Sequence, residues 1–269
     1  MKVKNDMKIQ TGKGTIPLIT LVAILSVSAI VSLPGLAISP ILDDVNRIFP
    51  HSRKLEVSML ESLPSLMIIP FMLLSGRWSI AGNKIRILFI GTLLFLLSGI
   101  WSLLSSSLTQ LIVAGAVMGV GAGMIIPLST GLIVEYFTGD RRVRQLGVSS
   151  AVNNLTLVVA TSVVGYLADV SWHLAFAVYL LPLITLILLP AIRRTTPEPE
   201  PSGGAQHRQS TLNRGIIARL MLFYFVITYL SLIVTYNTSY LVSERGMGDD
   251  RSGVIISLFF LAIMAPGFI

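Results

Sequence analysis

The stretch "MGVGAGMIIPLS" (residues 118–129) combines alternating glycines with an apolar run and a proline. Its glycines belong to a longer series in which Gly115, Gly119 and Gly123 are spaced by four residues. Four residues advance an α-helix by about 400°, so these glycines lie along one slowly drifting ridge. A ridge without side chains lets a neighbouring helix backbone approach closely, as in membrane proteins. The stretch therefore predicts a packing helix, with Gly115, Gly119, Gly123 and Pro127 at the contact.

The same stretch does not fit a nucleotide-binding loop. A dinucleotide site needs the spacing G-x-G-x-x-G after a strand, with an acidic residue about twenty positions later. A Walker loop needs a lysine after its second glycine. Neither pattern is present. Gly121 lies on a different face from the ridge, and we expect it to serve flexibility.

Composition indicates a membrane protein. Of the 269 residues, 53% are hydrophobic and 12% are charged, and the mean hydropathy is +0.80. A soluble domain carries about 25% charged residues. The sequence contains no cysteine, which excludes disulfides, thiolate metal sites and cysteine nucleophiles.

Eight apolar segments follow one another along the chain. Each is long enough, or nearly so, for the helix of about 20 residues that spans a bilayer. They cover residues 16–42, 57–76, 87–108, 110–134, 146–168, 174–192, 220–242 and 253–269. Only Glu61 is charged within them, as expected because a charge at mid-membrane costs about 2.5–3.5 kcal/mol. The predicted fold class is an all-α integral membrane protein.

The basic residues predict the orientation. Of the 20 lysines and arginines, 15 lie in alternating connections, at residues 2–13, 77–86, 141–144 and 193–219. An excess of basic residues marks the cytoplasmic side, so we expect a cytoplasmic amino terminus. The net charge of +7 is then a topology signal and requires no nucleic-acid partner. A signal peptide cleaved after "LAIS" is the alternative for the first segment, but that run is too long for one.

The predicted organisation has four parts. A cytoplasmic tail at 1–15 precedes a six-helix bundle at 16–192. The stretch "RRTTPEPEPSGGAQHRQSTLNRG" (193–215) is rich in proline, glycine and charge, which predicts a disordered cytoplasmic linker. Residues 216–269 hold the first two helices of a second set. The chain stops inside "LFFLAIMAPGFI" without a polar exit, so we expect a truncation within helix 8.

Three motifs carry a family resemblance. "SGRWSIAGNKIR" (75–86) resembles a glycine-aspartate-basic loop signature through Gly76, Gly82, Lys84 and Arg86, without its aspartate. "GVGAGMIIPLSTGLIVEYFTGDRRVRQLG" (119–147) resembles helix 4 and its exit in drug-efflux-like transporters, and "SWHLAF" (171–176) resembles the entry to helix 6. In this order the motifs resemble the major facilitator superfamily of twelve-helix secondary transporters. The resemblance implies a major-facilitator-type helix bundle.

The resemblance also implies a central cavity surrounded by helices 1, 4, 5 and 7 and their counterparts. Polar side chains on helices 1, 5 and 7 are therefore candidates for cargo contact: Ser28 and Ser32, with Ser26 on the same strip, Asn153 and Asn154, and Tyr229, Tyr236 and Asn237. Near the cytoplasmic loops, Asp140, Arg141 and Arg142 resemble the family's inner gate. A plain topological anchor is the alternative for these three residues.

Glu61 is the candidate for coupling transport to an ion. A carboxylate in lipid is costly, so it should face protein or a water-filled cavity, and such residues commonly mark ion pathways. The alternative is that Glu61 lies one turn inside the outer interface and reaches water there.

The sequence departs from the family's pattern at two places that bear on proton-driven export. The arginine common in helix 4 of the family corresponds to Gly115, and "TLVVATSVVG" (156–165) replaces the glycine-proline signature of antiporters in helix 5. The expected function is a secondary transporter that works by alternating access, with proton-coupled efflux of organic compounds as the first choice. Uptake of a small metabolite or anion is the alternative, and a non-transporting membrane sensor or scaffold is another.

No enzyme is expected. Asp43 and Asp44 resemble the paired aspartates of prenyltransferases, but no second pair exists, and no serine–histidine–carboxylate group is evident. We therefore predict no catalytic residues, metal or cofactor. The expected partners are a small-molecule cargo, membrane lipid and protons, for a monomeric multi-pass protein of the cell membrane.

Overall fold

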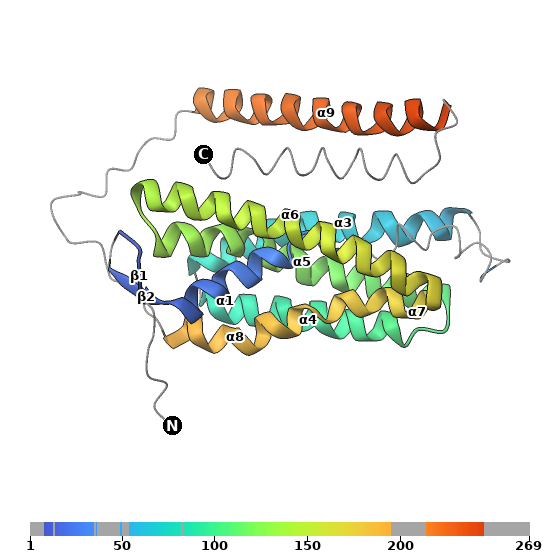
Figure 1. Ribbon diagram of the computed structural model, residues 1–269, viewed down its shortest axis with the longest axis horizontal. Helices are drawn as coiled ribbons and strands as arrows, with labels where there is room; N and C mark the ends of the chain where they lie inside the picture. Colours follow the sequence, from blue (N-terminus) through green and yellow to red (C-terminus); the bar gives the residue numbers. More distant parts are fainter. Residues whose placement is uncertain are drawn as a thin grey trace. The chain divides into compact units, whose positions relative to one another are not determined.

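The computed structural model describes residues 8–12, 14–34, 36, 49, 54–81, 83–194 and 214–244. The chain divides into two units, residues 1–198 with 266–269, and residues 199–265. In the described part of the first unit, a short hairpin is followed by seven α-helices and one 3-10 helix (Figure 1): β1 (Lys8–Gln10), β2 (Thr15–Pro17), α1 (Leu18–Ala29), α3 (Lys54–Ala81), α4 (Lys84–Leu103), α5 (Leu108–Tyr136), α6 (Gly139–Val170), α7 (Trp172–Ala175), η1 (Phe176–Leu180) and α8 (Pro182–Arg194). The second unit contains α9 (Arg214–Glu244).

The predicted fold class, an all-α integral membrane protein, is confirmed. In the described ranges, five stretches are long and apolar enough to cross a membrane: Leu55–Ser79, Lys84–Leu103, Leu108–Tyr136, Gly139–Ala168 and Trp172–Ile192. The apolar helices Leu18–Ala29 and Gly215–Leu230 are shorter. The predicted segment 253–269 lies outside the described residues. The β1–β2 hairpin is a small addition to the predicted all-α fold.

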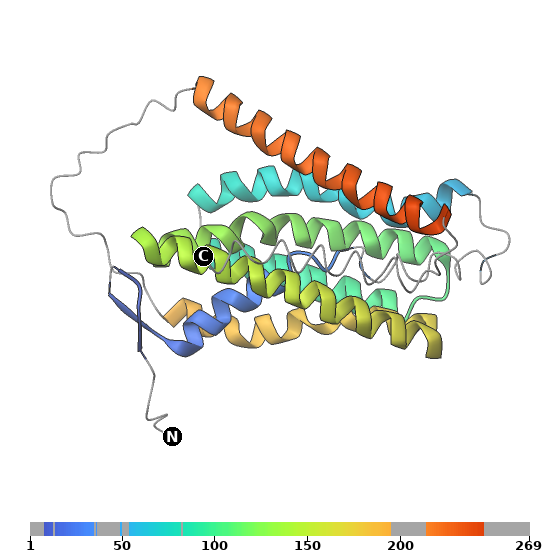
Figure 2. The same ribbon diagram turned by 45° about the horizontal axis from the view of Figure 1, so that its top comes forward.

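Helix α5 packs against two helices at once, α3 on one face and α4 on the other (Figure 2). The alternating glycines make both contacts possible. A Cβ atom built on Gly123 would lie 2.6 Å from the carbonyl oxygen of Ile68 in α3, and one on Gly121 would lie 2.7 Å from the carbonyl oxygen of Gly91 in α4. We expected Gly121 to serve flexibility, but it lies in a packing contact. It is on the side of α5 that meets α4, away from the ridge of Gly115, Gly119 and Gly123.

The glycine ridge follows α3 for two turns and then leaves it. A Cβ atom on Gly115 would lie 3.1 Å from Cγ of Pro64, and one on Gly119 would collide with the carbonyl oxygen of Pro64. At Gly131, by contrast, a Cβ atom would meet nothing within 4 Å. Pro127, the remaining residue of the predicted contact, lies half-buried inside α5.

A serine-rich break separates α4 from α5. The sequence predicted that the third helix continues to Leu108, but α4 ends at Leu103. The hydroxyl oxygen of Ser107 accepts a hydrogen bond from the Gln110 N–H at 3.3 Å, and the Gln110 side chain accepts one from the Ser106 N–H at 2.9 Å. The first bond satisfies an N–H group that the first helical turn leaves unpaired, and the second fixes the chain just before the N-cap residue Ser107, so Leu108 begins a new helix.

Helix α1 ends well before the predicted end of the first apolar segment, of which residues 35 and 37–42 lie outside the described residues. Helix α1 begins at Leu18 and ends at Ala29, and turns follow it. Pro34 disfavours helical backbone at the preceding residue, which opposes continuation of the helix. Ile16, predicted to begin this helix, pairs instead with Ile9 in the antiparallel hairpin. Gly12 forms the tight connection with φ of +90°, a conformation that favours glycine.

The fifth and sixth predicted helices also differ from the prediction. Helix α6 begins at Gly139 rather than Leu146, so the basic residues 141–144 lie in its first turns. The sixth helix is divided into α7, η1 and α8. Pro182 is the first residue of α8. A proline lacks the backbone N–H that would continue the hydrogen bonds of the preceding turns, so a new helix begins there. The η1 segment packs on α4, where the Phe95 and Tyr179 rings meet edge-on with centroids 5.8 Å apart.

Candidate functional site

A polar contact joins α1 to α6 inside the first unit. The hydroxyl of Ser149 in α6 donates a hydrogen bond to the hydroxyl oxygen of Ser28 in α1, at 2.7 Å. Ser28 is buried, with 2% of its surface exposed. Because both residues lie in apolar helices, the bond marks a polar position within the bundle.

Two further polar residues of α6 lie on the same face as Ser149. Gln145, Ser149 and Asn153 are spaced by four residues and so form one row along the helix; we call these three residues the α6 polar row. The Gln145 Oε1 and Asn153 Oδ1 atoms are buried, and neither accepts a hydrogen bond from the described part of the chain. A buried acceptor left unpaired costs about 1–3 kcal/mol. The row therefore presents two oxygen acceptors that a bound water or cargo donor could satisfy.

The other helix-bundle candidates have local roles or different surroundings. The Asn154 side chain donates to the Ser150 carbonyl of its own helix at 3.0 Å. Ser26 lies on the α8 side of α1, where its carbonyl accepts a bond from the Thr185 hydroxyl at 3.1 Å. Ser32, predicted on helix 1, lies in the turn after α1, because the helix ends at Ala29. The predicted serine strip is therefore not one continuous face.

The remaining candidates for cargo contact and coupling are Tyr229, Tyr236, Asn237 and Glu61, of which the structure describes the side chain of Tyr229. Tyr229 is exposed on α9 in the second unit and stacks on Phe225, with ring centroids 6.2 Å apart. The side chains of Tyr236, Asn237 and Glu61 lie outside the described residues, although their backbones are helical. Their proposed roles stay predictions.

Charged residues gather where α4 begins and α5 ends. Lys84 Nζ lies 2.8 Å from Glu135 Oε2, which links the first turn of α4 to the last turn of α5. The Asn83 side chain caps α4 by accepting the N–H groups of Ile85 and Arg86. Gly76 lies in α3 with open space around its Cα, and Gly82 lies outside the described residues. Within this loop motif, the ion pair is the interaction that joins two helices.

The β1–β2 hairpin sits on the turn between α5 and α6 (Figure 1). The Thr138 N–H donates to the Thr11 carbonyl at 3.1 Å, and Arg141 donates to Gln10 Oε1 at 2.6 Å. Arg142 donates from Nε to the Phe137 carbonyl at 2.8 Å, which closes the end of α5. Asp140, in the same turn, is exposed. We call this end of the first unit the hairpin end.

The Lys84–Glu135 ion pair is expected to stabilise the fold only weakly. Both side chains are more than a third exposed, at 41% and 36%, and exposed pairs contribute about 0.2–1 kcal/mol. A double-mutant cycle with Lys84→Gln and Glu135→Gln, followed by denaturant unfolding in detergent, measures this coupling energy. A coupling energy of about 3 kcal/mol or more, the range of broken buried pairs, would contradict the prediction.

Sequence reasoning missed several of these residues. Gln145 and Ser149 were overlooked although their spacing of four residues to Asn153 places them on one helix face. Glu135 and Gln10 carried no comparable signal, because their partners are 51 and 131 residues away in the chain. In the residues that the structure describes, no group of three or more histidine, aspartate or glutamate side chains could hold a metal ion.

Comparisons with known proteins agree with this architecture. The Multidrug resistance protein 3 of Bacillus subtilis is 27% identical over 102 residues, which cover 38% of this chain and 20% of that protein. The Quinolone resistance protein NorA of Staphylococcus aureus is 27% identical over 115 residues, covering 43% and 29% respectively. The chain thus matches less than a third of the length of these relatives.

A solved structure shares the fold. The proton:xylose symporter XylE matches with a TM-score of 0.56 and 18% identity, over 66% of this chain and 44% of the symporter. The fold and family are those of transporters rather than enzymes. The family description "Major Facilitator Superfamily" matches residues 18–269, and the chain belongs to this family.

Proposed function

We propose that the protein moves a small molecule across the cell membrane by alternating access, with the α6 polar row contacting the cargo. The buried, unpaired acceptors of Gln145 and Asn153 support this proposal most directly. A transporter that rocks two halves around a midplane site needs polar groups inside an otherwise apolar bundle. The row supplies such groups at the contact between α1 and α6.

The proposal includes a second helical half that begins after a linker. In this arrangement residues 16–192 form the first bundle, 193–215 the linker, and 216–269 the first two helices of the second half. Both halves would flank the cargo, and Tyr229, Tyr236 and Asn237 would approach it from the second half. The distribution of lysine and arginine supports a cytoplasmic hairpin end, since basic residues are retained on that side.

Efflux of organic compounds is the proposed direction and cargo class. The names of the drug-resistance relatives favour it, and a row of two amides and one hydroxyl within apolar helices suits partly apolar molecules that carry a few donors. Uptake is the second candidate, favoured by the fold shared with a proton:xylose symporter. We propose protons as the coupling ion and a monomer as the transporting form.

Flux in proteoliposomes tests the proposal. The full chain would be reconstituted and assayed with ethidium, a fluorescent quinolone and labelled xylose, with and without an imposed pH gradient. We expect gradient-dependent movement of ethidium or the quinolone. Movement of xylose alone would favour the uptake candidate, and no flux of any of the three would favour a sensor or scaffold. Flux that ignores the gradient would exclude proton coupling.

Glu61→Gln is expected to abolish the effect of the pH gradient while leaving downhill flux within about twofold. The reason is that the amide is similar in size to the carboxylate but cannot exchange a proton, and carboxylates inside membrane helices commonly serve proton relays. Gradient-driven and downhill ethidium flux would be measured on the same vesicles. Glu56→Gln, one and a half turns earlier in the same helix, is the control. An unchanged gradient effect in Glu61→Gln would remove Glu61 from the mechanism.

A further inference from the structure

A groove between α4 and α8 is not used by the proposed transport path. It has a volume of about 500 Å³ and is lined by Asn83, Ile85, Arg86, Phe89, Leu186, Leu189 and Pro190. Ligand sites commonly measure about 300–1,000 Å³. The groove lies at the hairpin end, where α4 begins and α8 ends. None of its lining residues belongs to the α6 polar row.

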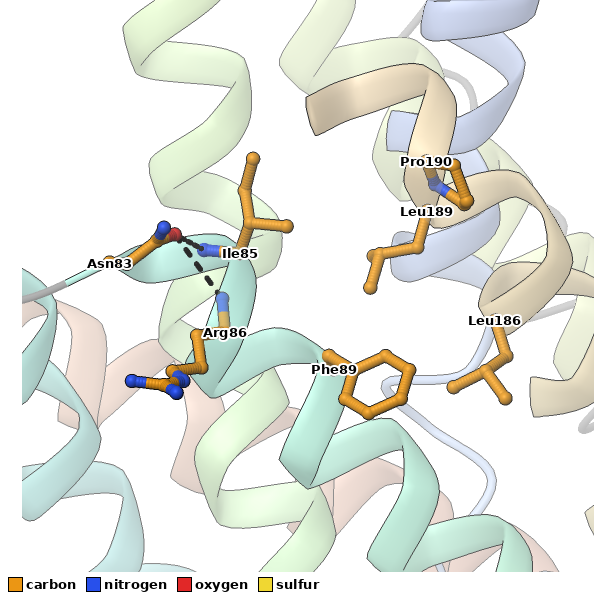
Figure 3. Close-up of a pocket in the computed structure, with 7 residues that line it drawn as sticks. All are labelled: Asn83, Ile85, Arg86, Phe89, Leu186, Leu189 and Pro190. Atoms are coloured by element: carbon orange, nitrogen blue, oxygen red, sulfur yellow. Dashed lines mark hydrogen bonds between the residues drawn. The ribbon is translucent and has the colours of Figure 1, made fainter. Parts of the chain in front are cut away.

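The lining changes from polar to apolar along the helix axis. Asn83 caps the amino terminus of α4, Arg86 lies in its first turn, and Phe89 lies three residues deeper, about 4.5 Å along the axis. Figure 3 shows Phe89, Leu186 and Leu189 directed toward the space between α4 and α8, whereas the side chains of Asn83 and Arg86 lie at the start of α4 on the side away from α8. A molecule that fits this order has a polar head at the helix ends and an apolar chain along the spans.

The charge of the groove selects an anionic head. Neither α4 nor α8 contains an aspartate or glutamate, and α8 ends in Arg193 and Arg194. The Arg86 side chain is exposed, and its guanidinium forms no ion pair with the described residues. Lys84, by contrast, is paired with Glu135. Among the described residues that line the groove, Arg86 is therefore an exposed cation without an ion-pair partner.

We propose that the α4–α8 groove binds an anionic phospholipid of the membrane, with its phosphate at Arg86 and an acyl chain against Phe89 and Leu186. The Asn83 side-chain oxygen already caps α4, and the NH2 group of the same amide would donate a hydrogen bond to the phosphate beside Arg86. Both helices end at the level of the lipid headgroups if their apolar stretches span the bilayer, and arginines at such ends attract anionic lipid. Lipid binding here is independent of the cargo site.

Retention of lipid by the purified full chain tests the proposal. The protein in detergent would be incubated with equal amounts of phosphatidylglycerol and phosphatidylcholine, and bound lipid counted by native mass spectrometry. We expect selective retention of phosphatidylglycerol, reduced about fivefold by Arg86→Gln, since one basic residue near the surface contributes about that factor. Arg86→Lys should restore most of it. Arg144→Gln removes an exposed arginine at the same end and should change retention less than twofold.

Two further arms separate a lipid from a free anion. Leu186→Trp fills the apolar part of the groove without changing its charge, and it should lower phosphatidylglycerol retention as much as Arg86→Gln. Millimolar inorganic phosphate should not displace the lipid. Equal retention of both lipids, equal effects of Arg86→Gln and Arg144→Gln, an ineffective Leu186→Trp, or displacement by phosphate would each overturn the proposal. Circular dichroism on every variant checks that the helices are intact.

Discussion

Gly119→Ala is expected to destabilise the first unit by about 1–3 kcal/mol, the usual cost of forcing extra atoms into a packed interior. The added methyl group would collide with the Pro64 carbonyl oxygen and lie 2.9 Å from the Met67 Cβ atom in α3. The nearest obstacle is backbone, which cannot rotate away as a flexible side chain can. Helices α3 and α5 would have to move apart, which would disrupt the packing between them. Thermal unfolding in detergent, followed by circular dichroism, measures the loss.

Gly131→Ala provides the matched control in the same helix. A Cβ atom there meets nothing within 4 Å, and alanine is more favourable than glycine in a helix interior by up to about 1 kcal/mol. The two identical substitutions are therefore expected to act in opposite directions. If Gly119→Ala and Gly131→Ala shift the unfolding temperature equally, the close approach of α3 to Gly119 does not exist in the membrane protein.

Asn153→Leu is expected to reduce cargo flux about tenfold or more without reducing stability. If the Asn153 Oδ1 atom accepts a hydrogen bond from the cargo, its loss costs about 1–3 kcal/mol of binding, which corresponds to about five- to a hundredfold. The same replacement removes a buried, unpaired oxygen from the empty protein. Leucine has the same number and branching of side-chain heavy atoms as asparagine, so the unfolding temperature should stay constant or rise. Ethidium flux and thermal unfolding, measured on the same preparation, separate the two effects.

Asn154→Leu is the control for Asn153→Leu. The Asn154 amide donates to its own helix at Ser150, so we expect flux within twofold of the original protein. A loss of stability in Asn153→Leu would indicate that the side chain has a structural partner instead. Equal flux in both variants would remove the α6 polar row from the cargo path.

The helix boundaries show where sequence reasoning was incomplete. Pro34, the serines at 105–107 and Pro182 were visible in the sequence, yet apolar runs were extended through all three breaks. The mean hydropathy of a run reports whether a segment prefers lipid, whereas the end of a helix depends on which N–H and C=O groups find other partners. The Ser107 hydroxyl oxygen accepts from the Gln110 N–H, and the Gln110 side chain accepts from the Ser106 N–H, and these contacts separate α4 from α5.

The candidate site was predicted in part. Ser28 and Asn153 were chosen as polar residues in apolar helices, and the structure places Ser28 opposite Ser149 on the helix that also carries Asn153. Asn154 was equally plausible in the sequence, because adjacent residues differ by about 100° around a helix and only the packing shows which one points inward. The hairpin that receives Arg141 was not predicted, because its six paired residues were read as a tail and the start of a helix.

The sequence by itself determined that this protein is a bundle of membrane helices and that the helix at 108–136 carries a bare glycine ridge. Both properties depend on local quantities, the hydrophobicity of a segment and the spacing of small residues along one helix. The tertiary structure decided which partner each glycine meets: α3 at Gly119 and Gly123, and α4 at Gly121. It also decided which polar atoms stay unpaired in α6. These outcomes depend on contacts between residues far apart in the chain, which no local pattern specifies.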